Sequence, residues 1–401
     1  MNVTAIIAEY NPFHNGHFYH LQQARLETNA DFLIVLMSGD FVQRGEPALL
    51  DKWCRTKMAL LGGADLVLEL PCFSASGSAE YFASGAISLL NASGVVSCLS
   101  FGSESGDLKS LSCAASFFAQ EPTLYQTFLK RELKKGLSFP KARKNAFLAC
   151  QKENDPDKSS SLEALLDSPN NLLGMEYLKA LIRQNSSILP HTIKRCGMGY
   201  HDLTLSSSCF GSASGIRKTL IDHPSLESIR HQIPPDVFSV WTDCWNKYGP
   251  IFLDDFSALL HYRLLSFHDR LQLCEHYDLS GEIADRILKI RSDFTSFSAF
   301  ISLLKTRQIT YTRSLLHLLL NMQQKTADSF FKNSAGYLRI LGFRKNASPL
   351  LAAIKKTSEL PIITKLADAK KLLSDDAFSV LLQDIFCSNV YHTIVAQKYP
   401  E

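Results

Sequence analysis

The first hundred residues alternate between short apolar runs and amphipathic stretches, and this alternation constrains the fold more than any other feature. The apolar runs cover Val3–Ala8, Phe32–Met37, Leu66–Leu70 and Val95–Phe101. Short, wholly apolar runs are typical of parallel strands that are buried on both faces. Helical patterns separate these runs, and the joins are short. We therefore predict an α/β fold with an N-terminal doubly wound parallel sheet.

The sequence changes character after Pro224. Amphipathic stretches there predict helices at Phe256–Leu273, Gly281–Ser292, Ser314–Met322 and Ala367–Cys387. A chain of 401 residues is also long for a single core. We predict an α/β domain over residues 1–224 and a mainly α-helical domain over residues 225–401.

Charge is unevenly distributed, although the formal net charge is only +3. Residues 1–110 carry six Lys or Arg against eleven Asp or Glu, which gives a net charge of −5. Residues 332–371 carry nine Lys or Arg against two Asp or Glu, which gives +7. Two segments of opposite charge indicate different tasks within one protein.

The ten cysteines form no CxxC pair, so the sequence predicts no zinc site and no thioredoxin-like motif. No leader peptide is recognisable, and no apolar run approaches the ~20 residues that cross a bilayer. We expect a cytoplasmic protein without membrane association, whose thiols are reduced.

The most informative motif is His14-Asn15-Gly16-His17, which follows the first predicted strand and opens the first predicted helix. The first N–H groups of a helix lack partners and, with the helix dipole, favour a bound anion. Imidazoles at this turn can donate hydrogen bonds to phosphate oxygens. The turn therefore predicts a site that stabilises the charge on a departing pyrophosphate.

This HxGH spacing resembles the nucleotidylyltransferase superfamily, whose second motif is I-S-S-T-x-I-R. Residues 211–217 match that motif, with Gly, Ala and Ser in place of its first Ile, second Ser and Thr. The match implies that Arg217 holds phosphates through its planar guanidinium, and that Ser212 and Ser214 donate hydroxyls and cap a helix. A lone HxGH also arises by chance, but a strand before it and a second motif after it favour a nucleotide site.

Several longer segments point to one branch of that superfamily. They are Ile6–His17, Met37–Trp53, Gly62–Pro71, Ser78–Ala86, Phe101–Glu104, Asn170–Leu181, Ile193–Arg195 and Thr310–Arg313. Together they resemble the bacterial tRNA(Met) cytidine acetate ligase family. The resemblance spans nearly the whole chain, and no general rule of folding demands a run such as Val42-Gln43-Arg44-Gly45-Glu46-Pro47.

The resemblance implies an enzyme that activates acetate with ATP and passes the acetyl group from acetyl-adenylate to N4 of the wobble cytidine (C34) of elongator tRNA(Met). It implies His14, His17 and Arg217 as catalytic residues. The implied ATP-binding residues are Ile7, Asn11, Pro12, Phe13, His14, Asn15, Gly16, His17, His20, Gly102, Asn171, Arg195, Ser212, Ser214 and Arg217. ATP is the expected cosubstrate, and an accompanying Mg²⁺ is left open.

Simpler roles compete with three of these assignments. Gly102 ends a strand, where a parallel sheet places ligands, but it could be a turn glycine. Asn171 could cap a helix, and Arg195 could be a surface residue.

Other residues near the predicted strand ends are ambiguous. Glu104 and Asp107 could bind Mg²⁺, although solvated loop acids are the simpler interpretation. Gln43 and Arg44, which follow Asp40 after the second strand, could contact acetate or the target cytidine, or could hold their own loop.

Basic stretches at 130–144, 305–313 and 339–371 are candidates for tRNA binding. The stretch 305–313 contains Lys305, Arg307, Tyr311 and Arg313, so it combines cations with an aromatic side chain. Such runs are often solvated helix faces, but the charge asymmetry and the resemblance favour RNA phosphates as partners.

Two other functions remain open at this point. The first is an adenylyltransferase that releases a free small-molecule product, and the second is a nucleotide-sensing RNA-binding protein without chemistry. The acetate pocket and the oligomeric state are not readable from the sequence.

Overall fold

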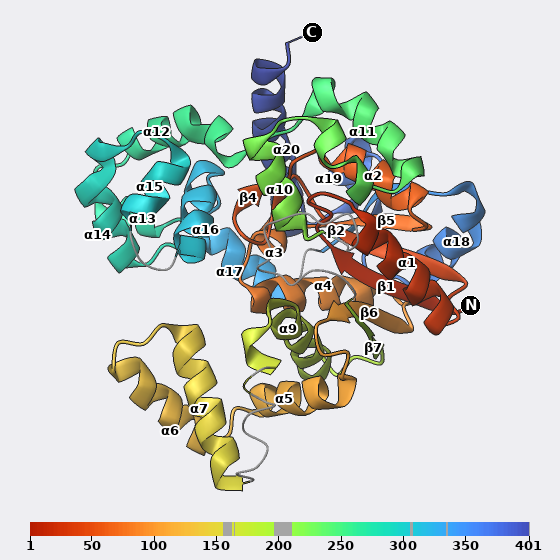
Figure 1. Ribbon diagram of the computed structural model, residues 1–401, viewed down its shortest axis with the longest axis horizontal. Coiled ribbons are helices and arrows are strands. Elements are labelled where there is room, and N and C mark those ends of the chain that lie inside the picture. Colours follow the sequence, from red (N-terminus) through yellow and green to blue (C-terminus); the bar gives the residue numbers. More distant parts are fainter. Residues whose placement is uncertain (155–162, 164, 196–210, 305–307, 334–335, 401) are drawn as a thin grey trace.

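Figure 1 shows the computed structural model, which describes residues 1–154, 163, 165–195, 211–304, 308–333 and 336–400. Within these residues, a seven-stranded sheet runs in the order β7-β6-β1-β2-β5-β8-β9. Its parallel strands are β1 (Val3–Ala8), β2 (Phe32–Ser38), β5 (Leu66–Leu70), β6 (Cys98–Ser103) and β7 (Leu189–Lys194). The predicted α/β class with a doubly wound parallel sheet is confirmed.

Helices cover both faces of the sheet, as Figure 1 shows. One layer is α1 (Asn15–Glu27), α2 (Lys52–Leu61), α10 (Ala213–Asp222) and α11 (Pro235–Tyr248). The opposite layer begins with α4 (Ala79–Ser93), α5 (Leu108–Gln120) and α9 (Pro169–Arg183). A hairpin of α6 (Thr123–Lys134) and α7 (Phe139–Asn154) projects beyond this second layer.

The apolar runs form strands because both of their faces are buried. In β2, Leu33 and Val35 pack into the core beneath α1 and α2, whereas Ile34 and Leu36 pack into the opposite core. All four side chains are fully buried. Burial of each side chain contributes roughly 1.5–3 kcal/mol. Because neither face of the strand meets solvent, apolar residues do not alternate with polar ones along it.

The first helix differs from the prediction. The helical pattern after Gly16 predicts Phe18, Leu21 and Leu26 as its inward positions. In the structure Leu21 and Ala24 face the core, whereas Phe18 and Leu26 are exposed. The reason is that α1 turns another face, with His17, toward a cavity at the end of the sheet, and this rotates the core-facing stripe.

The region after residue 224 is mainly helical, as predicted. Its longer helices are α12 (Ser257–Leu265), α14 (Gly281–Ile290), α15 (Phe297–Leu303), α16 (Gln308–Leu319), α17 (Gln324–Asn333), α18 (Ser348–Thr357) and α20 (Asp375–Lys398). The single helix predicted over 256–273 is instead two, because α13 (Arg270–Cys274) starts anew at its N-cap, Asp269.

The same region also contributes two strands, which the sequence did not predict. β8 (Leu338–Phe343) lies antiparallel to β5, and β9 (Ile362–Ile363) pairs with β8. The sheet therefore contains residues from both sides of the boundary predicted at 224/225, and the division into domains 1–224 and 225–401 remains a prediction.

Cys54 in α2 and Cys244 in α11 form a disulfide. The expectation of reduced thiols is therefore wrong for this pair. The two helices pack side by side on one face of the sheet, which brings two cysteines 190 residues apart into bonding range. The other cysteines in the described residues form no disulfide.

Candidate active site

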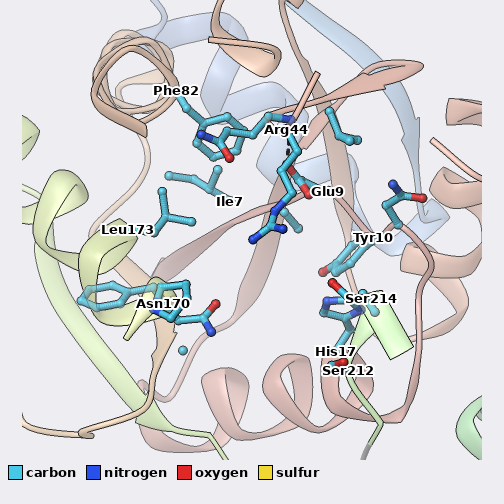
Figure 2. Close-up of a pocket in the computed structure, with 18 of the residues that line it drawn as sticks. Ile7, Glu9, Tyr10, His17, Arg44, Phe82, Asn170, Leu173, Ser212 and Ser214 are labelled. Carbon is cyan, nitrogen blue, oxygen red and sulfur yellow. Dashed lines mark hydrogen bonds between the residues drawn. The ribbon is translucent and has the colours of Figure 1, made fainter. Parts of the chain in front are cut away.

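A cavity of about 360 Å³ opens at the carboxyl ends of β1 and β6, where parallel sheets place ligands. Its walls come from the β1–α1 turn, the loop after β2, the start of α9 and the start of α10. Figure 2 shows side chains from all four segments pointing into it. The predicted site residues that line it are Ile7, Asn11, His14, His17, His20, Gly102, Arg195, Ser212, Ser214 and Arg217.

His14 holds the β1–α1 turn and faces the cavity at the same time. It is the N-cap of α1, and its Nδ1 accepts a hydrogen bond from the Gly16 N–H at 3.0 Å. The neutral ring therefore carries its proton on Nε2, which is free to donate. The His14 and His17 rings lie 3.9 Å apart between centroids, so the two imidazoles form one surface.

Burial keeps His14, His17 and His20 neutral in the free protein. It lowers the pKa of His14 to about 3 and that of His20 to about 4, and the charge of Arg195 adds to both shifts. Burial also lowers the pKa of His17 well below its ordinary value. Neutral imidazoles donate hydrogen bonds without repelling one another, and such donors are suited to bind an anion.

The second motif meets the first across the cavity. Ser212 is the N-cap of α10 and accepts a hydrogen bond from the Gly215 N–H at 3.0 Å. Arg217 donates through Nη1 to the Asn11 carbonyl at 2.7 Å, and its Nη2 lies 3.5 Å from a carboxylate oxygen of Glu46. The guanidinium is thus fixed at the cavity beside the histidine turn.

Gly102 and Arg195 are coupled across two neighbouring strands. β6 and β7 run parallel with Gly102 opposite Ile193, and the Arg195 side chain lies over the glycine. A Cβ atom at residue 102 would sit 3.3 Å from Arg195 Cγ, closer than most side chains tolerate. The glycine therefore makes room for the arginine, and both line the cavity.

Glu104 fixes the start of α9. Its carboxylate accepts hydrogen bonds from the Asn170 N–H at 3.2 Å, the Asn170 side-chain amide at 2.7 Å and the Asn171 N–H at 2.8 Å. Asp107 caps α5 through the Ser110 N–H at 3.1 Å. The two candidate Mg²⁺ ligands thus act as helix caps.

Five of the predicted ATP-binding residues do not line the cavity. Asn171 is buried and accepts a hydrogen bond from the Ser105 N–H, whereas its neighbour Asn170 faces the cavity. Phe13 belongs to the core, and Asn15 donates to the His231 carbonyl at 2.9 Å. The others are Pro12 and Gly16, and Gly16 lines a small adjoining recess of about 50 Å³.

Sequence reasoning missed several residues of the cavity. Glu9 and Tyr10 continue β1 into the turn, and Phe82, Leu173 and Tyr177 come from α4 and α9. Figure 2 shows Ile7, Phe82 and Leu173 as an apolar group on one side of the view. Glu9 was the detectable omission, because a carboxylate directly after a buried strand is unusual. The apolar residues read as ordinary core.

Gln43 and Arg44 reach the cavity from a hairpin between β3 (Phe41–Val42) and β4 (Glu46–Pro47). Gly45 closes this hairpin with φ +78° and packs against α16, where a Cβ atom would lie 2.6 Å from Arg313 N. The motifs VQRGEP and TYTR, which lie more than 260 residues apart in the sequence, are therefore in contact with each other.

Buried charges anchor the same hairpin. Asp40 accepts hydrogen bonds from the Lys52 N–H and from the Ser388 hydroxyl of α20, both at 2.8 Å. Arg55 is almost fully buried and donates to the carbonyls of Glu9 at 2.7 Å and Ser38 at 3.0 Å, and to that of Gly39. The ends of β1 and β2 are thereby joined.

The basic stretches behave differently from one another. Lys130, Arg131, Lys134, Lys135 and Lys141 are exposed on the α6–α7 hairpin. In the stretch 339–371, Arg339 is buried and pairs with Glu69 at 2.8 Å, so the expectation of RNA contact is wrong for that residue. The exposed cations there are Lys345, Lys355, Lys356, Lys365, Lys370 and Lys371.

The stretch 305–313 contributes fewer candidate contacts for RNA phosphates. Lys305 and Arg307 lie outside the described residues. Tyr311 is buried, and Arg313 pairs with Asp278 at 3.2 Å. Within the described residues, no helix is long and apolar enough to span a bilayer.

Comparison with known proteins agrees with this geometry. The sequence profile of the HIGH Nucleotidyl Transferase family matches residues 1–401, which defines the class of the fold and site. A tRNA(Met) cytidine acetate ligase of Thermoanaerobacter sp. (strain X514) is 41% identical over 395 residues, covering 98% of this chain and 95% of that protein. One from Caldicellulosiruptor saccharolyticus is 41% identical over 407 residues, with coverage of 100% and 95%. The chain belongs to the tRNA(Met) cytidine acetate ligase family.

Solved structures lead to the same family. Thermotoga maritima TmcAL in its apo form superposes with a TM-score of 0.93 at 32% identity, covering 99% of this chain and 96% of that one. The form bound to alpha-thio ATP superposes with a TM-score of 0.91 at 32% identity, covering 100% and 97%.

Proposed function

We propose that the protein activates acetate with ATP as acetyl-adenylate and transfers the acetyl group to N4 of the wobble cytidine of elongator tRNA(Met). The observation that carries the proposal is that one cavity holds both halves of the site this chemistry requires. His14, His17, Ser212 and Arg217 form a phosphate side. Glu9, Arg44, Ile7, Phe82 and Leu173 form an acceptor side.

The phosphate side fits the first step. The acetate carboxylate is a competent nucleophile, so this step needs alignment with the α-phosphorus and neutralisation of pyrophosphate rather than a base. His14 Nε2 and the Arg217 guanidinium are donors of the kind that stabilise such charge. Gly102 lies near the end of β6, Arg195 directly follows β7 and Asn170 lies in the first turn of α9, and we place the adenosine among them. The relative's complex with alpha-thio ATP supports an ATP site of this kind.

Mg²⁺ is proposed to arrive with the ATP phosphates rather than on a preformed protein site. Within the described residues no three His, Cys, Asp or Glu side chains group as metal ligands. Glu104 and Asp107 both have helix ends as partners. Magnesium bound mainly through substrate phosphates and water is common in nucleotide enzymes.

The acceptor side fits a small acyl group and a base. Ile7, Phe82 and Leu173 give an apolar recess for the acetate methyl, and Arg44 gives a cation for a carboxylate. The exposed lysines of the α6–α7 hairpin and of residues 345–371 are the proposed contacts for tRNA phosphates. Because tRNA is its substrate, we place the protein in the cytoplasm.

Incubation with ATP, labelled acetate and total bacterial tRNA, followed by nucleoside analysis of the digested RNA, tests the proposal. We expect label in N4-acetylcytidine, dependent on both ATP and acetate, and confined to tRNA(Met). Pyrophosphate release with the label in a free small molecule would instead indicate an adenylyltransferase of cofactor metabolism. Nucleotide and RNA binding without any turnover would indicate a sensor.

A further inference from the structure

Glu9 is a cavity carboxylate with one oxygen that is not engaged by the described residues. Among the described residues that line the cavity, only Glu9 and Glu46 are acidic, and Glu46 lies against Arg217 at 3.5 Å. One oxygen of Glu9, Oε1, accepts a hydrogen bond from the Gln43 N–H at 2.8 Å. Its second oxygen has no hydrogen-bond or ion-pair partner within the described part of the chain.

The position of Glu9 is rigidly fixed. Its carbonyl accepts a hydrogen bond at 2.7 Å from Arg55, which is almost fully buried and also holds the end of β2. Its side chain is tied to the Gln43 N–H of the hairpin. A group that must meet a substrate atom works best when the protein holds it in place beforehand.

The surroundings of Glu9 favour proton uptake. Burial raises the pKa of its carboxyl group, and this outweighs the opposing effects of the Gln43 hydrogen bond and of the charges on Arg217 and Arg44. The charged and titratable groups that face it from neighbouring elements are Arg44 and Glu46 of the hairpin, Arg55 of α2, Tyr177 of α9 and Arg217 of α10.

Among the described residues that line the cavity, none is a better base. His14 and His17 have pKa values lowered by burial, so they bind protons weakly, and His14 Nδ1 is occupied by the Gly16 N–H. In Figure 2 both Glu9 and Arg44 lie between the apolar group and the cluster of His17, Ser212 and Ser214. That is where an acetyl group and its acceptor would meet.

We propose that Glu9 binds the N4 amine of the acceptor cytidine and accepts a proton from N4 during acetyl transfer. This proposal rests on the proposed function. The exocyclic amine of cytosine is a hydrogen-bond donor, and a carboxylate is its usual protein partner. N4 attacks the acetyl carbonyl carbon, a C–N bond forms, and the C–O bond to the AMP phosphate breaks. AMP leaves with the electron pair, and the N4 proton passes to the free oxygen of Glu9.

This role separates Glu9 from the residues of the first step. Acetate activation releases no proton from a nucleophile, whereas amide formation does. A carboxylate that accepts the hydrogen bond of N4 also selects cytidine over uridine. Uridine carries O4 at the same place, and this oxygen is a hydrogen-bond acceptor that would face another acceptor.

The test uses Glu9→Gln, which keeps an oxygen for the Gln43 N–H but cannot take up the proton. Enzyme preloaded with labelled acetyl-adenylate is mixed with tRNA(Met), and labelled N4-acetylcytidine is followed in a single turnover. We expect the transfer rate to fall by about 100-fold, the size of effect typical of a general base. Acetate-dependent ATP–pyrophosphate exchange should fall less than tenfold.

Glu46→Gln is the matched control, because it removes the other carboxylate of the cavity. Its contact with Arg217 predicts the opposite pattern, with exchange impaired more than transfer. The pH profile adds a readout that a structural role would not move. Transfer by the wild-type enzyme should decline as pH falls toward the carboxyl pKa, whereas transfer by Glu9→Gln should be low and independent of pH in that range.

The outcomes are distinct. Wild-type protein without acetate-dependent exchange and without labelled N4-acetylcytidine would contradict the proposed function itself. Wild-type activity with transfer by Glu9→Gln within threefold of normal would overturn the role of Glu9 alone, and so would equal losses in both half-reactions. If Glu9→Gln fails to fold by circular dichroism, Glu9→Asp tests the same point, since it must retain a pH-dependent but slower transfer.

Discussion

The two sides of the cavity are held in place in different ways. On the phosphate side, His14 caps its own helix two residues away, and Ser212 does the same for α10. On the acceptor side, the hairpin with Arg44 depends on Arg313 of α16 and on Ser388 and Tyr391 of α20. Each motif of the first side is capped locally, and the two motifs meet where Arg217 donates to the Asn11 carbonyl. The second side depends on contacts over more than 260 residues, so ATP chemistry and acceptor chemistry should respond to different substitutions.

The largest expected effect is on the phosphate side. His14→Ala or His17→Ala should lower acetate-dependent ATP–pyrophosphate exchange by at least 100-fold, the loss typical when one donor to developing charge is removed. Affinity for tRNA, measured by filter binding, should stay within twofold. His223→Ala, at an exposed histidine after α10, is the control and should match the wild type. A parallel loss of tRNA binding would contradict the separation of the two sides.

Gly45→Ala should disturb the acceptor side. Its φ of +78° costs an alanine about 1–2 kcal/mol, and the added Cβ also meets the backbone of Arg313. We expect acetyl transfer to fall more than exchange, together with a lower melting temperature. Gly136→Ala is a close control, because Gly136 has φ +79° with nothing within 4 Å. Equal effects of the two substitutions would mean that the contact with α16 is unimportant.

A pH effect on stability should come from the phosphate side. His14 and His20 have folded-state pKa values near 3 and 4, against an ordinary value of 6.5. Above pH 6.5 they are neutral in both states and contribute no slope. Between about 6.5 and 4 only the unfolded chain takes up their protons, so the free energy of unfolding falls as pH falls.

His20→Gln measures that slope. Denaturant titrations near pH 5 should show it reduced by about 1 kcal/mol per pH unit relative to the wild type. His268→Gln, at an exposed histidine, should leave the slope unchanged. An unchanged slope in His20→Gln would show that this histidine titrates normally in the folded protein.

The smallest effect should come from Tyr391→Phe. The hydroxyl of Tyr391 donates to the Ala48 carbonyl at 2.8 Å in a buried position, and its loss should cost about 0.5–1.5 kcal/mol. Urea denaturation gives the value, and Tyr262→Phe at a side chain that is 70% exposed is the control. A loss no larger than that of the control would show that α20 does not hold the loop after β2.

Much of the fold was predictable where a pattern is complete within a few residues. The runs at 3–8 and 66–70 match their strands residue for residue. Local apolar content decides these elements, because both faces of each strand are buried. The strand at 338–343 was not recognised, because Arg339 and Gly342 make it read as a basic loop. Arg339 tolerates burial only because Glu69 lies opposite.

The candidate site divides in the same way. Motifs with fixed spacing predicted His14, His17 and Arg217 in one cavity, and the structure brings them together. No spacing rule links Phe82 or Leu173 to that cavity, because packing of α4 and α9 on the sheet decides which core residue borders a void. The disulfide between Cys54 and Cys244 depends on the same kind of long-range packing.

The antiparallel strand β8 also bears on how the protein is made. β5 ends at Leu70, but its outer neighbour begins only at Leu338. At the usual 5–20 residues per second, the ribosome needs on the order of tens of seconds to supply the missing strand. Throughout that interval the edge of β5 presents unpaired N–H and C=O groups, the features that attract another chain. Completion of the sheet is therefore a late event of translation. A nascent chain that stops before Leu338 exposes an aggregation-prone strand edge, which β8 covers in the complete protein.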